Sequence, residues 1–192
     1  MAQFTLHDET TAPEASKALL AGQTKAWGFT PKLHATLAES PAALGGYVAL
    51  FDLVKTTSLT PVEQQVVYQA VNVLHACEYC TAGHTYLSRA VGMPEEVISA
   101  LRNATPIADA RLQALRQFAE TVVHTRGFAS DAAVDAFLAA GFTRAQVLDV
   151  VLIIATKTIS NYTNHLTHTP KEDFMSDPAL GWIAPRNRDK AA

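Results

Sequence analysis

The stretch HACEYCTAGHTYL, residues 75–87, contains residue types that can carry out redox chemistry. Cys77 and Cys80 lie three positions apart and are the only two cysteines of the 192-residue chain, and His84 follows four positions after the second. On an α-helix these three side chains fall within roughly 60° of arc, so the spacing predicts a compact cluster of two thiols and a base on one helix face. The free backbone amides of a helix start stabilise a thiolate, and a histidine one turn later can accept a proton.

Reduction of a peroxide needs these parts. A thiolate attacks the O–O bond and becomes a sulfenic acid, and a second cysteine condenses with it to form a disulfide. We therefore expect Cys77 and Cys80 to form a reversible disulfide, because a helix start allows the backbone adjustment that brings two sulfurs together. By analogy with thioredoxin the first cysteine would be the nucleophile, whereas the i+4 position of His84 favours Cys80.

Three other interpretations use the same residues. The cysteines could be a buried pair of small apolar side chains. A zinc site could add His75, but structural zinc sites usually collect ligands from two separated segments, and a continuous helix would direct His75 away. A thioredoxin-like active site needs flanking strands, for which the sequence gives no pattern. We therefore expect neither a metal nor another cofactor.

Composition limits the possible partners. The chain has a formal net charge of −3, 48% hydrophobic residues and 17% charged residues, which is typical of a globular protein and gives no basic surface for nucleic acid or anionic lipid. The first 16 residues lack the basic and apolar segments of a signal peptide, and no later stretch predicts a membrane span. We expect a cytoplasmic protein with a small-molecule substrate.

The elements that position the cysteine cluster are expected to be helices. Thr60, Pro61 and Glu63 have the types and spacing of a helix start with a capping box, and apolar residues recur from Val62 at intervals of three and four. A second helix is expected over residues 77–91.

The rest of the chain gives the same kind of pattern. We expect a short helix from Pro94, a longer one through 112–122, a short one over 131–140, and a last one that begins with a capping box of Thr143 and Gln146. No segment alternates as a strand would. The sequence thus predicts an all-α fold in one domain, residues 1–192.

The core of this domain is expected at 27–168, between irregular arms at 1–13 and 170–192. Trp182 in the second arm suits an extended segment that lies on the domain or on a neighbouring subunit. A shift of 83 residues also aligns Thr60 with Thr143 and Cys77 with Ser160, which suggests two helical hairpins of similar build. The apolar faces of both long helices predict a homo-oligomer.

Longer stretches carry a family resemblance. The run LTPVEQQVVYQAVNVLHACEYCTAGHTYLSRAVGMP resembles the core of the AhpD-like alkylhydroperoxidases in the carboxymuconolactone decarboxylase family. GFTPKLHATLAESPAAL and GFTRAQVLDVVLIIATKTISNYTNH resemble the segments before and after that core in the peroxidase-related members. The likeness covers most of residues 27–168.

The resemblance implies a function and an assembly. Such proteins are all-α trimers or hexamers, and an assembly built from dimers is also compatible with the apolar faces. They reduce organic hydroperoxides, or carry electrons as a dithiol, and are recharged by a thiol or a lipoyl or thioredoxin-like electron donor. The resemblance assigns attack to Cys80, resolution of the sulfenic acid to Cys77 and proton transfer to His84.

One position departs from the family pattern. The family uses a glutamate twelve residues before the first cysteine, and this chain has Gln65 there. An amide can orient an imidazole but cannot exchange a proton at neutral pH. Two alternatives to a peroxidase therefore stay open, a non-redox enzyme of the wider family and a redox-sensing helical oligomer whose proton relay has decayed.

Overall fold

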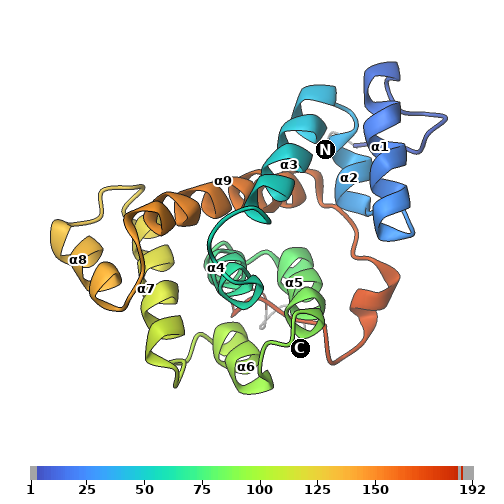
Figure 1. The fold of residues 1–192 in the computed structure, drawn as a ribbon. Coiled ribbons are helices and arrows are strands. Elements are labelled where there is room, and N and C mark those ends of the chain that lie inside the picture. Colours follow the sequence, from blue (N-terminus) through green and yellow to red (C-terminus); the bar gives the residue numbers. More distant parts are fainter. Residues whose placement is uncertain (1–3, 186, 188–192) are drawn as a thin grey trace.

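A computed structural model describes residues 4–185 and 187, and all regular elements in this part of the chain are helical, as predicted (Figure 1). In chain order the elements are α1 (Glu14–Trp27), α2 (Lys32–Leu37), α3 (Pro41–Val54), α4 (Pro61–Leu74), α5 (Glu78–Ala90), α6 (Glu95–Asn103), α7 (Ala110–His124), α8 (Asp131–Ala139), α9 (Arg144–Thr167) and the 3-10 helix η1 (Asp173–Ser176).

Two helix starts have the predicted capping boxes. At α4 the Thr60 hydroxyl accepts a hydrogen bond from the amide of Glu63, and the Glu63 carboxylate accepts one from the amide of Thr60 at 2.8 Å. The same pair of bonds joins Thr143 and Gln146 at the start of α9. Glu63 also accepts from Arg111 at 2.8 Å, so its carboxylate is fully used in holding the start of α4.

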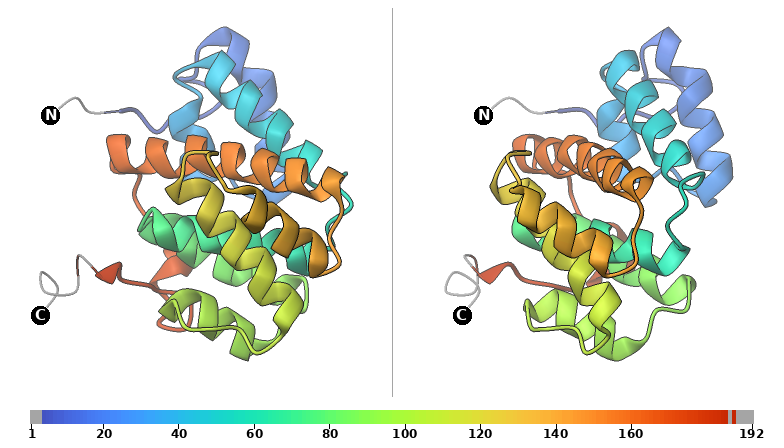
Figure 2. Two further views of the ribbon diagram at one scale, coloured as in Figure 1. Left: turned by 90° about the vertical axis from the view of Figure 1, so that its left-hand side faces the viewer. Right: turned by 60° about the vertical axis from the view of Figure 1, so that its left-hand side comes forward.

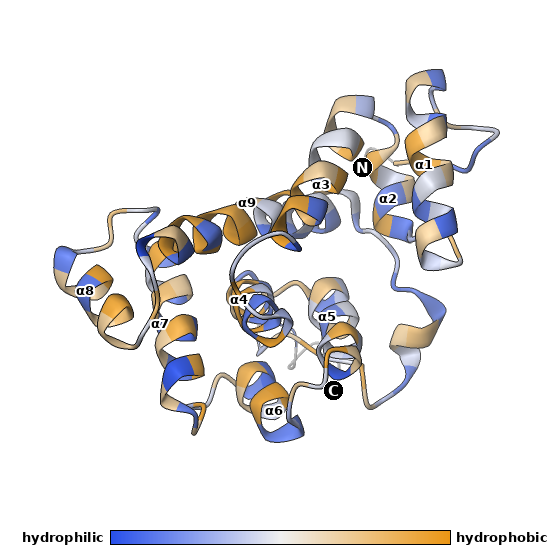
Figure 3. Ribbon diagram, viewed as in Figure 1, coloured by the Kyte–Doolittle hydropathy of each residue, from blue (hydrophilic) through white to orange (hydrophobic). Residues whose placement is uncertain are grey.

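Helix α9 lies between two groups of helices. It packs against α2 and α3 on one side and against α4, α5 and α7 on the other (Figures 1 and 2). Figure 3 shows apolar residues along much of α9, which borders both groups. The cysteine segment at the start of α5 is therefore covered by residues that are distant in sequence.

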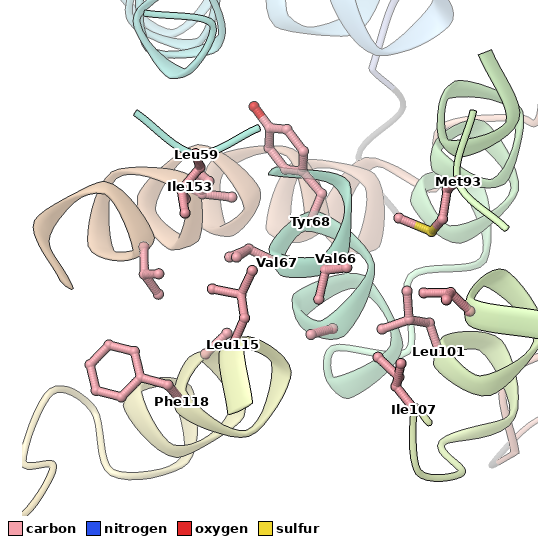
Figure 4. Packing of buried hydrophobic residues seen from close by; sticks show 14 of the residues in the cluster. Leu59, Val66, Val67, Tyr68, Met93, Leu101, Ile107, Leu115, Phe118 and Ile153 are labelled. Atoms are coloured by element: carbon pink, nitrogen blue, oxygen red, sulfur yellow. The ribbon is translucent and has the colours of Figure 1, made fainter. Parts of the chain in front are cut away.

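The buried apolar residues form two clusters. The larger joins α4 and α6–α9 and includes Val66, Val67, Leu115 and Ile153, which are labelled among its members in Figure 4. The smaller joins α1–α3 around residues such as Leu44. Burial of these side chains stabilises the packing of the helices by roughly 25 cal/mol for each Å² of apolar surface removed from water.

The chain breaks between α4 and α5, in agreement with the second helix expected from residue 77, so no continuous helix runs through His75. His75 is the C-cap of α4, Ala76 has φ 54°, and Cys77 is the N-cap of α5. His75 still turns from the cysteines, since its Nδ1 lies 2.9 Å from Oδ1 of Asn161. In the described part of the chain no three His, Cys, Asp or Glu side chains are grouped to hold a metal ion.

The expected second hairpin is wrong. Residue 160 aligns with Cys77, but it lies within α9, which runs unbroken from Arg144 to Thr167. The residue that aligns with Ala76 is Ile159, and a β-branched side chain strongly disfavours the positive φ needed for the break. The two segments therefore share only their capped beginnings.

The C-terminal arm lies on its own chain, one of the two predicted positions. Trp182 is buried, and its Nε1 donates to the carbonyl oxygen of Arg102 at 2.9 Å. Arg102 in turn donates to the carbonyl oxygens of Leu180 and Gly181. The parts of both arms at 1–3, 186 and 188–192 lie outside the described residues.

No single helix of the described residues is long and apolar enough to cross a membrane, whereas α8 and α9 meet the criteria only as a pair bent by 111°.

Candidate functional site

A cavity of about 320 Å³ lies between the two helix groups and reaches Cys80. Its walls come from α1–α3, α5, α9 and the segment around η1. Most of its lining is apolar or aromatic: Trp27, Phe29, Pro31, Leu33, Tyr47, Phe51, Tyr79, Tyr86, Leu87, Phe174 and Met175. The other side chains on it are those of Cys80, His34, His84, Lys157 and Glu172.

The two cysteines are free thiols and both are buried. The amide of Cys80 donates to Sγ of Cys77 at 3.4 Å, because Cys77 caps α5. The side-chain amide of Asn164 donates to Sγ of Cys80 at 3.1 Å and lies 3.8 Å from Sγ of Cys77. The sulfurs thus share a donor from α9.

The surroundings place the negative charge on Cys80. Burial opposes ionisation of Cys80, but the hydrogen bond from Cys77, the charge of Lys157 and the amides of Asn164 and Asn161 outweigh it and lower the pKa of Cys80 below its ordinary value. The hydrogen bond to Cys80, followed by burial, raises the pKa of Cys77. The helix-capping amide favours a thiolate at Cys77, yet the charge and the closer amide of α9 act on Cys80.

The cysteines open onto different hollows. Cys80 and His84 line the aromatic cavity, whereas Cys77 lines a second hollow of about 300 Å³ with Asn164 and Lys171. The prediction that all three side chains share one helix face is therefore wrong for Cys77, which precedes the helix. It is correct for Cys80 and His84.

His84 is held between two polar side chains. Its Nδ1 lies 2.8 Å from Oε1 of Gln65, and its Nε2 lies 3.1 Å from Nζ of Lys157. Oε1 only accepts, so Nδ1 carries the proton and Nε2 accepts from the lysine. Burial and then the charge of Lys157 lower the pKa of His84 well below its usual range, so the ring is neutral.

The four residues predicted from the sequence follow one another in a series of contacts rather than forming one cluster. Gln65 touches His84 and lines a separate hollow behind it. His84 shares the aromatic cavity with Cys80, and the amide of Cys80 is hydrogen-bonded to Sγ of Cys77. Gln65 acts on the site through His84.

Sequence reasoning missed Lys157 and Asn164. Both are buried, and both come from α9. A signal was present, since Val150, Ile153 and Lys157 follow the helical spacing of the buried face, and Asn164 continues it two turns later. A lysine on the apolar face of a helix is rarely without a function, because burial of an uncompensated charge is costly.

Tyr79, inside the cysteine motif, ties the cavity to the C-terminal arm. Its hydroxyl donates to the Glu172 carboxylate at 2.6 Å, and the amide of Lys32 donates to the same oxygen at 2.6 Å. Burial and then Glu172 raise the pKa of Tyr79. Glu172 therefore fixes the segment that carries Phe174 and Met175 onto the cavity.

Part of the chain matches a known protein family. Residues 41–121 match the Carboxymuconolactone decarboxylase family. No curated protein matches the chain. The family match confirms the family resemblance found in the cysteine segment, which lies within residues 41–121.

Three solved structures show the particular variant of the fold. An uncharacterized peroxidase-related protein from Ralstonia eutropha JMP134, described as an alkylhydroperoxidase AhpD core, has a TM-score of 0.79 at 20% identity over 90% of this chain and 93% of its own. A peroxidase-related protein from Silicibacter sp. TM1040 has 0.76 at 16% over 93% and 97%. The debrominase Bmp8 in complex with 2,3,4-tribromopyrrole has 0.71 at 16% over 90% and 93%.

Proposed function

We propose that this protein is a thiol-dependent peroxidase that reduces organic hydroperoxides with Cys80 and Cys77. The observation that carries the proposal is the position of Cys80 at an aromatic cavity, with a lowered pKa and with Cys77 as its hydrogen-bond donor. A thiolate that is buried beside a second thiol has the parts needed to reduce a peroxide and to resolve the product.

The reaction proceeds in two steps. The Cys80 thiolate attacks the terminal oxygen of the hydroperoxide, the O–O bond breaks, and the products are a sulfenic acid on Cys80 and an alkoxide that takes up a proton. Cys77 then attacks the Cys80 sulfur, an S–S bond forms, and the hydroxyl leaves as water with the proton of Cys77. The peroxide gains two electrons and the two thiols lose them.

His84 takes part in proton transfer within the site. Its neutral Nε2 can receive a proton from Lys157 or return one, while Gln65 keeps Nδ1 protonated. In the cytoplasm a thiol, or a lipoyl or thioredoxin-like donor, would restore the dithiol by exchange with the disulfide. The cavity walls favour hydroperoxides with a bulky apolar group over hydrogen peroxide.

The test is peroxide consumption by the reduced protein and by two variants. Cys77→Ser should consume one equivalent of cumene hydroperoxide and leave a trappable sulfenic acid, whereas Cys80→Ser should be inert. Intact mass of the wild type should fall by two hydrogen atoms after mild oxidation and recover with reductant. Free thiols that persist in the wild type would remove the proposal, and reversed variant results would assign attack to Cys77.

A second candidate is reductive dehalogenation of an aromatic compound, favoured by the aromatic walls around Cys80 and by the debrominase of similar fold. The thiolate would take the halogen from carbon, the carbon would gain a proton, and Cys77 would displace halide as the disulfide forms. Release of bromide from 2,3,4-tribromopyrrole, without any consumption of hydroperoxide, would select this candidate over the first.

A further inference from the structure

Lys157 is a buried cation that lines the cavity. Its relative exposure is 1%, its Nζ lies 3.1 Å from Nε2 of His84, and the ring centre of Tyr68 lies 5.7 Å away. None of the ion pairs between described residues includes Lys157. A buried ammonium group needs a compensating charge or strong acceptors.

The protein offers this cation one anion near neutral pH. The titratable groups that contact it or feel its charge are Tyr68, His75, Cys77, Cys80 and His84, and Tyr47 lines the same cavity. Burial raises the pKa of both tyrosines, and the two histidines are uncharged at neutral pH, so neither type can balance the lysine. The Cys80 thiolate is the anion that remains.

Gln65 makes Lys157 more dependent on the Cys80 thiolate. A glutamate in its place would bring a carboxylate to the opposite side of His84, whereas the amide is neutral. Glu172 lines the same cavity, but its carboxylate accepts from Tyr79 and from the amide of Lys32, and its other oxygen lies 4.0 Å from Nζ of Lys32. Glu172 is therefore occupied by partners at the cavity wall.

We propose that Lys157 makes the part of the cavity next to it a binding site for one organic anion, which the Cys80 thiolate and an anionic ligand occupy in turn. Loss of the thiolate, by oxidation or by substitution, frees the site for an aromatic carboxylate or another aromatic oxyanion. The aromatic walls supply the contact with the ring, and the ammonium group supplies the contact with the charge.

Where this site serves the reaction, the inference rests on the proposed function. When the thiolate attacks the O–O bond, the negative charge moves from sulfur to the leaving alkoxide oxygen, and Lys157 faces the same cavity. It stabilises that oxygen and donates a proton to it, and later regains a proton from solvent. Lys157 is in this sense a catalytic residue of the peroxidase.

The binding site is tested with benzoate and its neutral analogue benzamide. Calorimetry should detect benzoate binding to Cys80→Ala, in which no thiolate competes, and weaker binding to the reduced wild type. Benzamide should bind at least about tenfold more weakly than benzoate to Cys80→Ala, because an ammonium group bonds a carboxylate more strongly than an amide.

Lys157→Met in the Cys80→Ala background should weaken benzoate binding by about tenfold or more and leave benzamide binding unchanged. Methionine is unbranched, apolar and suited to burial, and a thermal melt checks that the variant folds. Lys55→Met removes a charge at an exposed lysine paired with Asp52 and is the matched control, which should bind benzoate normally.

The outcomes are distinct from those of the peroxidase test. Equal binding of benzoate and benzamide, or full benzoate binding by Lys157→Met, would overturn the anion site whatever the peroxidase activity. Lysine-dependent benzoate binding in a protein that consumes no hydroperoxide would keep the site and remove the proposed function. In an active enzyme, Lys157→Met should also lower the rate at saturating hydroperoxide more than it changes KM.

Discussion

Oε1 of Gln65 lies 2.8 Å from Nδ1 of His84 and holds the proton on that nitrogen. The opposite nitrogen is thereby left as an acceptor, and Nζ of Lys157 lies 3.1 Å from it. The residue that departs from the family pattern therefore still orients the imidazole. What it cannot do is accept the proton that a carboxylate would take.

Gln65→Glu should accelerate peroxide reduction by up to about tenfold. General-base catalysis is worth roughly 10² to 10⁴ in rate, but the new anion also disfavours the thiolate and offsets part of that gain. The gain should be greatest above neutral pH, where the new carboxyl group is ionised. Stopped-flow measurement of thiol oxidation from pH 6 to pH 9 checks this. Gln65→Met, which removes the acceptor, is the control and should be slower than the wild type.

If Gln65→Glu were equal to or slower than the wild type across that range, with the fold intact, proton transfer would have to run through Lys157 rather than through a family-type relay. This outcome would fit a site whose electrostatics have changed from a carboxylate beside the histidine to an ammonium group on its other side.

The Asn164 amide should set much of the acidity of Cys80. Asn164→Leu removes the donor 3.1 Å from Sγ, and a hydrogen bond to a charged group contributes roughly 1.5–3 kcal/mol, so the pKa of Cys80 should rise by about one unit or more. Ultraviolet thiolate absorbance against pH in a Cys77→Ser background measures it. Asn164→Leu also removes Oδ1, a buried acceptor without a hydrogen bond, so the thermal stability should not fall when the pKa of Cys80 rises.

Asn103→Leu, at an exposed asparagine of α6, is the matched control and should leave the titration unchanged. A Cys80 titration that Asn164→Leu does not move would show that the lysine charge alone governs the thiolate.

Features coded by neighbouring residues could be predicted from the sequence. The capping boxes at Thr60 and Thr143 depend on side chains three positions apart, and the thiol pair with its histidine lies within about two helical turns. The three helices α1–α3 were not predicted. The N-caps of α1 and α2 are prolines, which make no side-chain cap bond, and α2 has only six residues.

The missing half of the site is explained by distance along the chain. Asn164 meets Cys80 across 84 positions, and Lys157 meets His84 across 73. Periodicity indicates that both lie on the buried face of α9, but only the packing of α9 on α5 shows what they touch. A second helix from residue 77 was expected, but the positive φ of Ala76 was not, because a positive φ in alanine has no strong sequence signal.

Tyr79→Phe should loosen the wall of the cavity. It removes the hydroxyl 2.6 Å from the buried Glu172 carboxylate, at a cost of about 1–3 kcal/mol, and frees the segment with Phe174. We expect a lower melting temperature and a higher KM for cumene hydroperoxide. Tyr86→Phe, on the same helix and cavity but 53% exposed, should change neither, and equal effects of both variants would contradict the proposed clamp.

Self-association should use the exposed apolar face of α9. Leu148, Val151, Tyr162 and Leu166 lie along it at 70%, 47%, 52% and 74% exposure. We expect sedimentation to give a trimer, a hexamer or an assembly of dimers, and Leu148→Glu with Leu166→Glu to dissociate it. Phe128→Glu, at an 88% exposed residue outside the helices, is the control. A monomeric wild type would rule out the homo-oligomer.

Buried histidine should make the fold sensitive to acid. His34 is 6% exposed, and burial lowers its pKa from 6.5 to about 4. The unfolded chain therefore binds a proton below pH 6.5 that the folded chain does not bind until about pH 4, so stability falls as the pH decreases through this window. The loss from this one group is roughly 3 kcal/mol at most.

His34→Phe should remove that part of the acid sensitivity. The phenyl ring can replace the imidazole beside Trp27 and Tyr47, whose rings lie 6.4 and 5.5 Å from it, and it binds no proton. Urea unfolding at pH 7 and at pH 4.5 measures the difference, which should be smaller in His34→Phe than in the wild type. His124→Gln, at an exposed histidine, should keep the wild-type difference. An unchanged difference in His34→Phe would mean that His84 and other groups govern the acid response.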